Sequence, residues 1–252
     1  MFKLWAGFKD YHKTKILVGY PTLNPDGRFL KSLSEFIKQG RKKYDIEVLP
    51  VAGKELVDAQ NTIARYFLYN TDAEYLLLME DDHYGHKVEM LDALVNKNVE
   101  VSSINYYSRH FPYYSCLMRE LPDRKQDARF AGLGYTQGFE LCDLSGFAMM
   151  LIKRSVFKKL DKPYFRLNKF GGPGSYATDI EFCDRLKEYG IQIWGCFDYC
   201  LAHRDITPEN RMEKLLEGMK VSRDNDILQK FNLIKRRREN EFFARNTVIN
   251  NY

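Results

Sequence analysis

The chain has 252 residues, enough for one large domain or for a domain with a helical appendage. Lysine and arginine number 39 and aspartate and glutamate 34, which gives a formal net charge of +5. This excess is too small to indicate nucleic acid as the partner, although it favours an anionic ligand or surface. Hydrophobic residues make up 44% of the chain, and this excludes extensive disorder.

No stretch approaches the ~18–20 consecutive apolar residues of a membrane span, and the charged N-terminus lacks a signal-peptide core. The cysteines number five, an odd count that favours reduced thiols. We therefore expect a cytoplasmic protein without a transmembrane segment (the host cytoplasm, if the chain is viral). The basic run at 235–238 could make a peripheral contact with anionic lipid head groups or nucleic acid, or it is a solvated helix end.

Strand-like and helix-like segments alternate through the first half of the chain. Hydrophobic spacing and turn residues predict, in order, a strand at 15–20, a helix at 26–40, a strand at 44–51, a helix at 55–69, a strand at 75–79, a helix near 87–95 and a strand near 99–105. This series predicts an α/β fold with a Rossmann-like, mostly parallel central sheet and helices on both faces.

The second half is less regular. Its predicted elements are an aromatic, polar stretch at 105–114, a buried strand at 145–152, a short helix at 153–160, a glycine-rich loop at 170–178, a helix at 179–189, strands at 191–194 and 196–203, and a charged helical segment from 208 to about 238.

Three acids, Glu80, Asp81 and Asp82, arrive together where the apolar strand at 75–79 ends. Like charges crowded at one strand tip repel one another, so a cation among them would stabilise the cluster. Carboxylate oxygens suit Mg²⁺ or Mn²⁺, which commonly hold the phosphates of a nucleotide. Pro21 and Thr22 lie at the same edge of a parallel sheet, where ligands bind. The alternative is an acidic, solvated turn.

Several short motifs occur in a familiar order: KILVGYPT, QNTIAR, LLLMEDD, SGFAMMLIKRSVF, TDIEFCDRL and LAH. Together they resemble the nucleotide-sugar glycosyltransferases of the GT-A fold, in particular family-2-like members, including short viral and bacterial ones. The resemblance covers about residues 13–205. It implies a GT-A domain at 1–205, with a nucleotide-binding half at about 13–105 and an acceptor half at about 106–205. A helical, basic extension at 206–252 would follow.

The resemblance implies a metal-dependent enzyme that moves a sugar from a nucleotide-diphosphate sugar, a UDP- or GDP-sugar, to an acceptor hydroxyl. Asp82 is the expected ligand of Mn²⁺ or Mg²⁺, with Asp81 next and Glu80 as the ribose contact. His203 matches a late metal ligand of this family, and imidazole is acceptable to Mn²⁺. The alternative for His203 is a structural histidine at a strand end.

An inverting transfer needs a carboxylate base to deprotonate the acceptor hydroxyl. By resemblance Asp179 takes this position, although Thr178 replaces the family's usual first acid. Asp179 could instead serve only as a helix N-cap. Glu181 would orient the acceptor or lie in solvent.

Donor contacts are assigned by resemblance to Pro21 and Thr22, which meet the base, and to Asp58, Asn61 and Arg65. Asn61 and Arg65 are four residues apart and so are expected on one helix face. The family's usual Arg-Asn pair reads Gln60-Asn61 here. An ordinary surface salt bridge is the alternative for this face. Gly172 would belong to a flexible lid at 171–174, or to an idle loop.

The acceptor is expected to be a glycan, a glycolipid or, less readily, a nucleic acid. Tyr106, Arg109 and His110 begin an aromatic stretch that could stack on it, or that lines an ordinary loop. Two other classes compete with a glycosyltransferase. A metal-dependent phosphodiesterase or nuclease would need further acids or histidines at strand ends. A non-catalytic nucleic-acid-binding module would be indifferent to Asp82→Ala.

Overall fold

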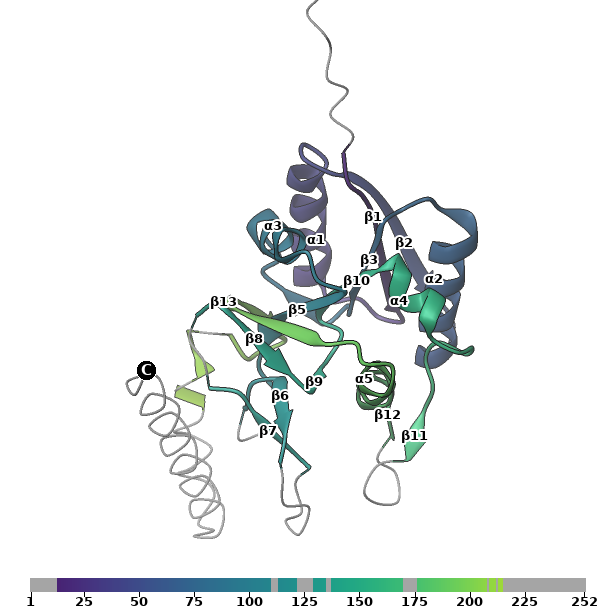
Figure 1. Ribbon diagram of the computed structural model, residues 1–252. Helices are drawn as coiled ribbons and strands as arrows, with labels where there is room; N and C mark the ends of the chain where they lie inside the picture. The colour runs from purple at the N-terminus through teal and green to yellow at the C-terminus, as the bar shows by residue number, and fades with distance from the viewer. Residues whose placement is uncertain are drawn as a thin grey trace, which may run out of the picture.

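The computed structural model describes residues 13–109, 113–121, 129–134, 137–169, 176–207, 209–211 and 213–214 (Figure 1). The predicted loop at 171–174 lies outside the described residues, and so does nearly all of the predicted extension at 206–252. No helix in the described part is both long and apolar enough to cross a membrane.

A mixed eight-stranded sheet forms the centre of the fold, in the order β2-β1-β3-β10-β5-β13-β4, with β8 also paired to β13. Its strands are β1 (Lys15–Thr22), β2 (Asp45–Ala52), β3 (Tyr75–Met79), β4 (His83–Tyr84), β5 (Val101–Tyr106), β8 (Phe139–Cys142), β10 (Met149–Lys153) and β13 (Ile193–His203).

Five of these strands are parallel, which confirms the predicted α/β class with a mostly parallel sheet. β1 runs parallel to β2 and β3, and β13 runs parallel to β5. β10 lies antiparallel between β3 and β5 and joins the two parallel groups. The strand predicted at 145–152 is therefore present as β10, but it begins at Met149.

Helices cover both faces of the sheet (Figure 1). They are α1 (Gly27–Gly40), α2 (Leu56–Asn70), α3 (Val88–Lys97), α4 (Arg154–Lys159) and α5 (Thr178–Glu188). Alternating strand residues separate two cores: Leu76 and Leu78 pack with α2, α4 and α5, whereas Leu77 and Met79 pack with α1 and α3. The five helices predicted between residues 26 and 189 are confirmed to within two residues at either end.

Helix α2 lies close to β1 because Gly19 has no side chain. A Cβ atom at Gly19 would lie 2.3 Å from Cγ2 of Ile63, which rests directly on the strand. At the far end of α2, the partly buried guanidinium of Arg154 donates hydrogen bonds to the carbonyl oxygens of Leu68, Thr71 and Ala73. These contacts satisfy carbonyl groups that a helix end leaves unpaired.

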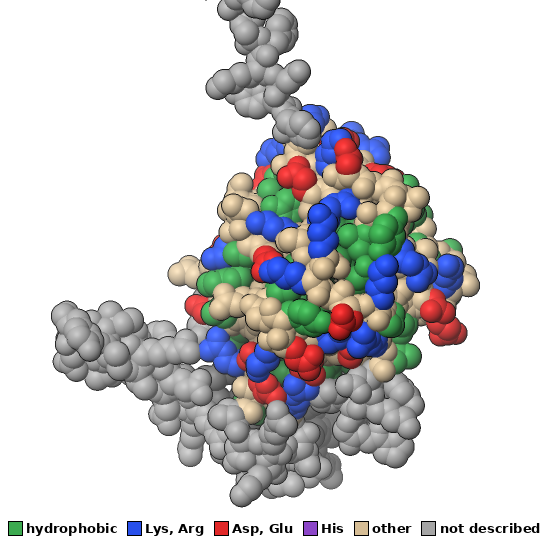
Figure 2. Space-filling view, turned by 45° about the vertical axis from the view of Figure 1, so that its right-hand side comes forward, with side chains coloured by type: hydrophobic (Ala, Val, Ile, Leu, Met, Phe, Trp, Pro, Cys, Tyr) green, Lys and Arg blue, Asp and Glu red, His purple; other side chains and the backbone are tan. Residues whose placement is uncertain are grey.

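Two smaller sheets flank the central one. A three-stranded sheet contains β6 (Leu117–Glu120), β7 (Phe130–Gly132) and β9 (Leu144–Ser145), and a two-stranded sheet contains β11 (Asn168–Lys169) and β12 (Tyr176–Ala177). The two strands predicted at 191–194 and 196–203 form one strand, β13, whose register shifts between Cys196 and Cys200. On the face shown in Figure 2, basic and acidic side chains are interspersed, so no field of a single sign covers it.

Candidate functional site

The predicted donor residues at the ends of β1 and β3 lie at one edge of the sheet. The register pairs Gly19 with Leu78, so Pro21 and Thr22 extend to the level at which the acids follow β3. The backbone N–H of Asp26 donates to the Asp81 carbonyl oxygen at 3.1 Å and ties the segment after β1 to the acid cluster. The predicted convergence of these segments is thus present.

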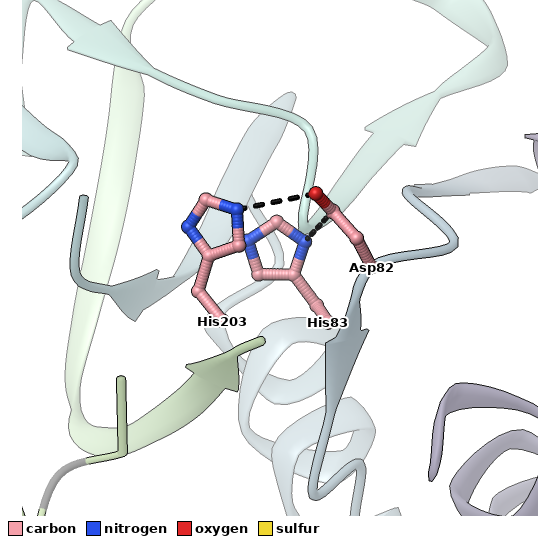
Figure 3. A group of neighbouring side chains, drawn as sticks. All are labelled: Asp82, His83 and His203. Carbon is pink, nitrogen blue, oxygen red and sulfur yellow. Dashed lines mark hydrogen bonds and ion pairs between the residues drawn. The ribbon is translucent and has the colours of Figure 1, made fainter. Parts of the chain in front are cut away.

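Asp82 lies beside two stacked histidines that come from neighbouring strands (Figure 3). Antiparallel pairing of β4 with β13 places His83 opposite His203. Nδ1 of His83 is 2.9 Å from Oδ1 of Asp82, and Nε2 of His203 is 3.2 Å from Oδ2. One potential ligand atom from each residue lies within 4.8 Å of the others.

A backbone carbonyl group fixes the orientation of the His203 ring. Its Nδ1 lies 3.1 Å from the backbone carbonyl of Tyr107, which accepts a hydrogen bond and so requires a proton on Nδ1. In a neutral ring the Nε2 lone pair then points at the Asp82 carboxylate. The lone pairs of His203 Nε2 and of the Asp82 carboxylate repel each other in this arrangement. A cation between the two atoms, or a second proton on the imidazole, would remove the repulsion.

The ring of Tyr106 packs edge-on against both histidine rings. The rings of His83 and His203 stack with centroids 4.1 Å apart, and the Tyr106 ring meets His83 edge-on at 4.5 Å. The hydroxyl of Tyr106 occupies the space where a Cβ atom of Gly146 would lie, at 1.8 Å. Tyr106 is 6% exposed, so the prediction that its ring stacks on an acceptor is wrong. The ring is part of the core beneath the site.

Two arginines also contact Asp82 at its outer side. The Nη1 atom of Arg109 is 3.6 Å from Oδ2, and Nε of Arg204 is 3.3 Å from the same oxygen. Arg109 therefore lies at the acid cluster itself, not on a separate acceptor platform.

The charges around the cluster shift the pKa values of its acids in opposite directions. Burial disfavours ionisation of Asp82, but contacts with His203 and His83 outweigh it and hold the pKa of Asp82 well below its usual range. Burial raises the pKa of Glu80 to about 8, and the negative charges of Asp82, Asp179 and Asp81 act in the same direction. Asp179, in the first turn of α5, is thus one of the charges that act on Glu80.

Asp179 lies in the first turn of α5, which begins at Thr178. Ala177 is the N-cap residue and no side chain caps the helix, so the alternative of Asp179 as the N-cap is wrong. Instead, Oδ1 of Asp179 accepts a hydrogen bond from the neighbouring Ile180 N–H at 2.9 Å. Burial raises the pKa of Asp179.

Glu181 is buried, and its side chain lies along α5 toward Arg185. One of its oxygens lies 3.8 Å from Nε of Arg185, while the other has no hydrogen-bond partner. Arg185 in turn donates to the carbonyl oxygens of Asp161, Pro163 and Tyr164. The expectation of a solvent-exposed Glu181 is wrong.

The three residues predicted on α2 do not share one surface. Asn61 is buried, and its amide donates to the carbonyls of Val57 and Phe165 while its oxygen accepts from the Phe165 N–H. Both amide hydrogens of Asn61 are therefore engaged within the protein. Asp58 and Arg65 are exposed. Arg65 donates to Thr62 and forms no ion pair among those found in the described residues.

Several buried side-chain polar atoms have no hydrogen-bond partner among the described residues. They belong to Thr22, Gln60, Asp81, His83, His86 and Glu181. Because buried polar groups in proteins are nearly always paired, such atoms indicate that a polar ligand or water completes the site. Gln60, which is fully buried, was not predicted as a site residue. The sequence feature that could have indicated it is its position next to Asn61, where the family usually has an Arg-Asn pair.

His83 is a second residue that the sequence interpretation did not select as a ligand, although it directly follows the three acids. Its ring is 1% exposed, and neither nitrogen makes a hydrogen bond of good geometry. The predicted acceptor residue His110 and the predicted lid residue Gly172 lie outside the described residues.

The donor set fits a divalent transition metal. One carboxylate and two imidazoles are ligands that Mn²⁺ accepts readily, whereas Mg²⁺ prefers oxygen alone. Adjacent ligands around an octahedral metal at ~2.1 Å lie about 3 Å apart. The two measured distances from Asp82 to the histidines agree with this value. Within the described part of the chain, this is the one group of at least three such side chains that could hold a metal.

Comparison with known proteins is informative only at the level of structure. No protein-family model matches the sequence, and no curated protein matches it. The crystal structure of A197 from STIV is similar over 77% of this chain and 95% of that one, with 13% identity and a TM-score of 0.50. At this identity the likeness shows a shared fold alone.

Two further solved structures are similar at lower scores. GalNAc-T7, crystallised with UDP, GalNAc and Mn²⁺, has 12% identity over 77% of this chain, which spans 44% of that protein, with a TM-score of 0.47. Glucosyl-3-phosphoglycerate synthase from Mycobacterium tuberculosis, in complex with Mn²⁺ and UDP-glucose, has 11% identity, coverage of 79% and 74%, and a TM-score of 0.42. These likenesses are too distant to show what this chain binds.

Proposed function

We propose that this protein is a metal-dependent glycosyltransferase that moves a sugar from a nucleotide-diphosphate sugar to an acceptor hydroxyl. One observation carries the proposal: Asp82, His83 and His203 converge at the carboxyl edge of a mostly parallel sheet. The negative charge of Asp179, in the first turn of α5, helps to raise the pKa of Glu80, and this supports a role for Asp179 as a proton acceptor near that cluster.

Asp82, His83 and His203 would hold the metal, with Asp81 beside them. A divalent ion bound there stabilises negative charge on the departing diphosphate as a Lewis acid. Tyr107 keeps the proton of His203 on Nδ1, so that Nε2 faces the site. Glu80, with its raised pKa, would contact the ribose, and Pro21 and Thr22 would meet the nucleobase of a UDP- or GDP-sugar.

Asp179 would act as the general base of an inverting transfer. Its hydrogen bond from Ile180 fixes one carboxylate oxygen. Burial raises its pKa, which makes the carboxylate a better proton acceptor for an attacking hydroxyl. Glu181, which is buried, would help to orient a glycan or glycolipid acceptor through its position in the first turn of α5, and a nucleic-acid acceptor is less favoured.

The competing classes receive less support from the described residues. A two-metal nuclease needs a second cluster of acids or histidines, and one cluster is found in the part of the chain that the structure describes. A non-catalytic nucleic-acid module would be expected to show a basic face, whereas charges of both signs alternate on the face in Figure 2.

The first test is a thermal-shift series with UDP and GDP in the presence and absence of Mn²⁺. We expect one nucleotide to raise the melting temperature of the wild-type protein only when Mn²⁺ is present. Asp82→Asn should remove this stabilisation and lower Mn²⁺-dependent donor hydrolysis at least about 100-fold, because a metal ligand is lost. The control is Asp72→Asn, at the opposite edge of the sheet, where Asp72 pairs with Lys15. Equal stabilisation of wild type and Asp82→Asn would refute the assignment of Asp82.

The second test separates donor binding from transfer. Asp179→Asn should leave the Mn²⁺-dependent nucleotide stabilisation unchanged but reduce sugar transfer about 100- to 10,000-fold, because the amide cannot accept the proton. Glu188→Gln, an exposed change on the same helix, is the matched control. Wild-type transfer rates in Asp179→Asn would show that this carboxylate is not the base.

A further inference from the structure

Arg109 and Arg204 both reach the same oxygen of Asp82 from outside the metal-binding group. Arg109 approaches Oδ2 at 3.6 Å and Arg204 at 3.3 Å, and Nε2 of His203 is 3.2 Å from the same atom. The arginine side chains are 42% and 55% exposed, so both guanidinium groups are partly open to solvent.

A divalent cation bound to Oδ2 would lie beside both guanidinium groups. The three positive charges would repel one another at contact distance. Binding of a metal to this oxygen therefore favours movement of the arginines away from it, and the two guanidinium groups then lose the carboxylate that they neutralised.

We propose that Arg109 and Arg204 exchange partners: they neutralise Asp82 in the empty site and bind the diphosphate of the donor once a metal occupies Asp82. This inference rests on the proposed function. A diphosphate carries the negative charge that the displaced groups require, and the planar fork of a guanidinium matches phosphate oxygens bidentately.

The backbone around Arg204 supports an exchange over a short distance. The Arg204 N–H donates to the Asp82 carbonyl oxygen at 3.1 Å, and Arg204 adopts a left-handed backbone with φ of 51°. This contact holds the main chain of Arg204 beside the site while its side chain is free of core packing. The guanidinium can therefore turn from Asp82 to a phosphate without movement of β13.

The exchange predicts that metal and diphosphate bind cooperatively. Without a diphosphate, the metal competes with two arginines for Asp82, so its affinity is reduced. With a diphosphate present, the arginines have a better partner and the competition disappears. By linkage, the metal must raise the affinity for the diphosphate by the same factor.

The test measures Mn²⁺ binding from the electron paramagnetic resonance signal of free Mn²⁺, without activity as the readout. Arg109→Gln and Arg204→Gln should each bind Mn²⁺ alone about two- to fivefold more tightly than wild type. With saturating Mn²⁺, both variants should bind UDP, GDP or inorganic pyrophosphate about tenfold or more weakly. Arg28→Gln is the matched control, because Arg28 pairs with Asp26 and Asp205 and has no ion pair with Asp82.

The outcomes separate this inference from the proposed function. Suppose that the wild-type protein binds Mn²⁺ and that both arginine variants bind Mn²⁺ and diphosphate as tightly as wild type does. This result would overturn the exchange but would leave the proposed metal site intact. Weaker Mn²⁺ binding in the variants would overturn it as well. Absence of Mn²⁺ binding in wild type would reject the metal role in the proposed function and this inference with it.

Discussion

Buried histidines near the site are held neutral by their surroundings. Burial lowers the pKa of His83 to about 4 and that of His86 to about 3. His86 packs edge-on against Phe29, with ring centroids 5.8 Å apart, and its Nδ1 lies 3.0 Å from the hydroxyl oxygen of Ser32. A charge on this ring would lack water, so protonation of His86 favours the unfolded chain.

This difference predicts how His86 affects stability with pH. The folded-state pKa of about 3 lies below the unfolded value of ~6.5, so the unfolded state binds the extra proton between these values. Stability should therefore fall as pH drops below 6.5, with His86 contributing a slope of up to ~1.4 kcal/mol per pH unit. The free energy of unfolding of His86→Phe, measured with urea between pH 7.5 and 5, should therefore depend less steeply on pH than that of wild type, by up to ~1.4 kcal/mol per pH unit.

The comparison is made on metal-free protein, so that loss of a metal at low pH does not add to the slope. His83 remains in both proteins and cancels in the difference. An identical pH dependence for wild type and His86→Phe would show that His86 does not gain its proton on unfolding.

At the scale of single residues, the sequence indicated which side chains could bind a metal better than it indicated which side chains are buried. The acid cluster and His203 could be recognised because their order along the chain matches strand ends. Asn61 and Tyr106 could not be placed from spacing alone, because the Phe165 segment and Gly146 that bury them are distant in sequence. The position of His83 depends on the pairing of β4 with β13, 120 residues apart.

Among the elements, α5 is held in place by charged contacts to the three-stranded sheet. Arg129, beside β7, contacts Asp184 of α5 through two nitrogens at 2.8 and 2.5 Å and Glu120 of β6 at 2.9 Å. Lys187 also reaches Glu120, and together the hydrogen bonds from Lys187 and Arg129 lower the pKa of Glu120 to about 2. This cluster fixes the helix whose first turn carries Asp179.

Arg129→Met should reduce the free energy of unfolding by about 1–3 kcal/mol, because it leaves two partly buried carboxylates without their shared partner. The measurement is urea unfolding at pH 7. Lys43→Met, which removes the exposed pair with Asp92, is the control and should cost little or nothing. Equal stability losses in the two variants would show that the Arg129 cluster acts only as an ordinary surface pair.

The helices and strands themselves were predictable, but their arrangement was only partly so. Periodicity and turn residues predicted α1, α2, α3 and the first strands closely, since each buries a stripe of local sequence. The insertion of β10 between β3 and β5 was not predictable, because a fully apolar strand carries no signal for its direction or neighbours. The shift within β13 likewise depends on pairing with β5 and β8.

At the scale of the whole molecule, the fold draws the residues of the proposed site from distant parts of the chain. β1 and β3 supply Thr22 and the acids, β13 supplies His203, and α5 supplies Asp179. The insertion of β10 joins the strand before the acids to the strand pair that carries His203. The account therefore depends on a metal at Asp82 that both halves of the sheet help to hold.

The most direct measurement is a crystal structure of the protein with Mn²⁺ and the stabilising nucleoside diphosphate, recorded with anomalous scattering at the manganese edge. We predict one anomalous peak within ~2.3 Å of a carboxylate oxygen of Asp82 and of Nε2 of His203, with phosphate oxygens completing the coordination sphere. A fully occupied nucleotide with no manganese peak there, and with Asp82 still paired to Arg204, would contradict the account.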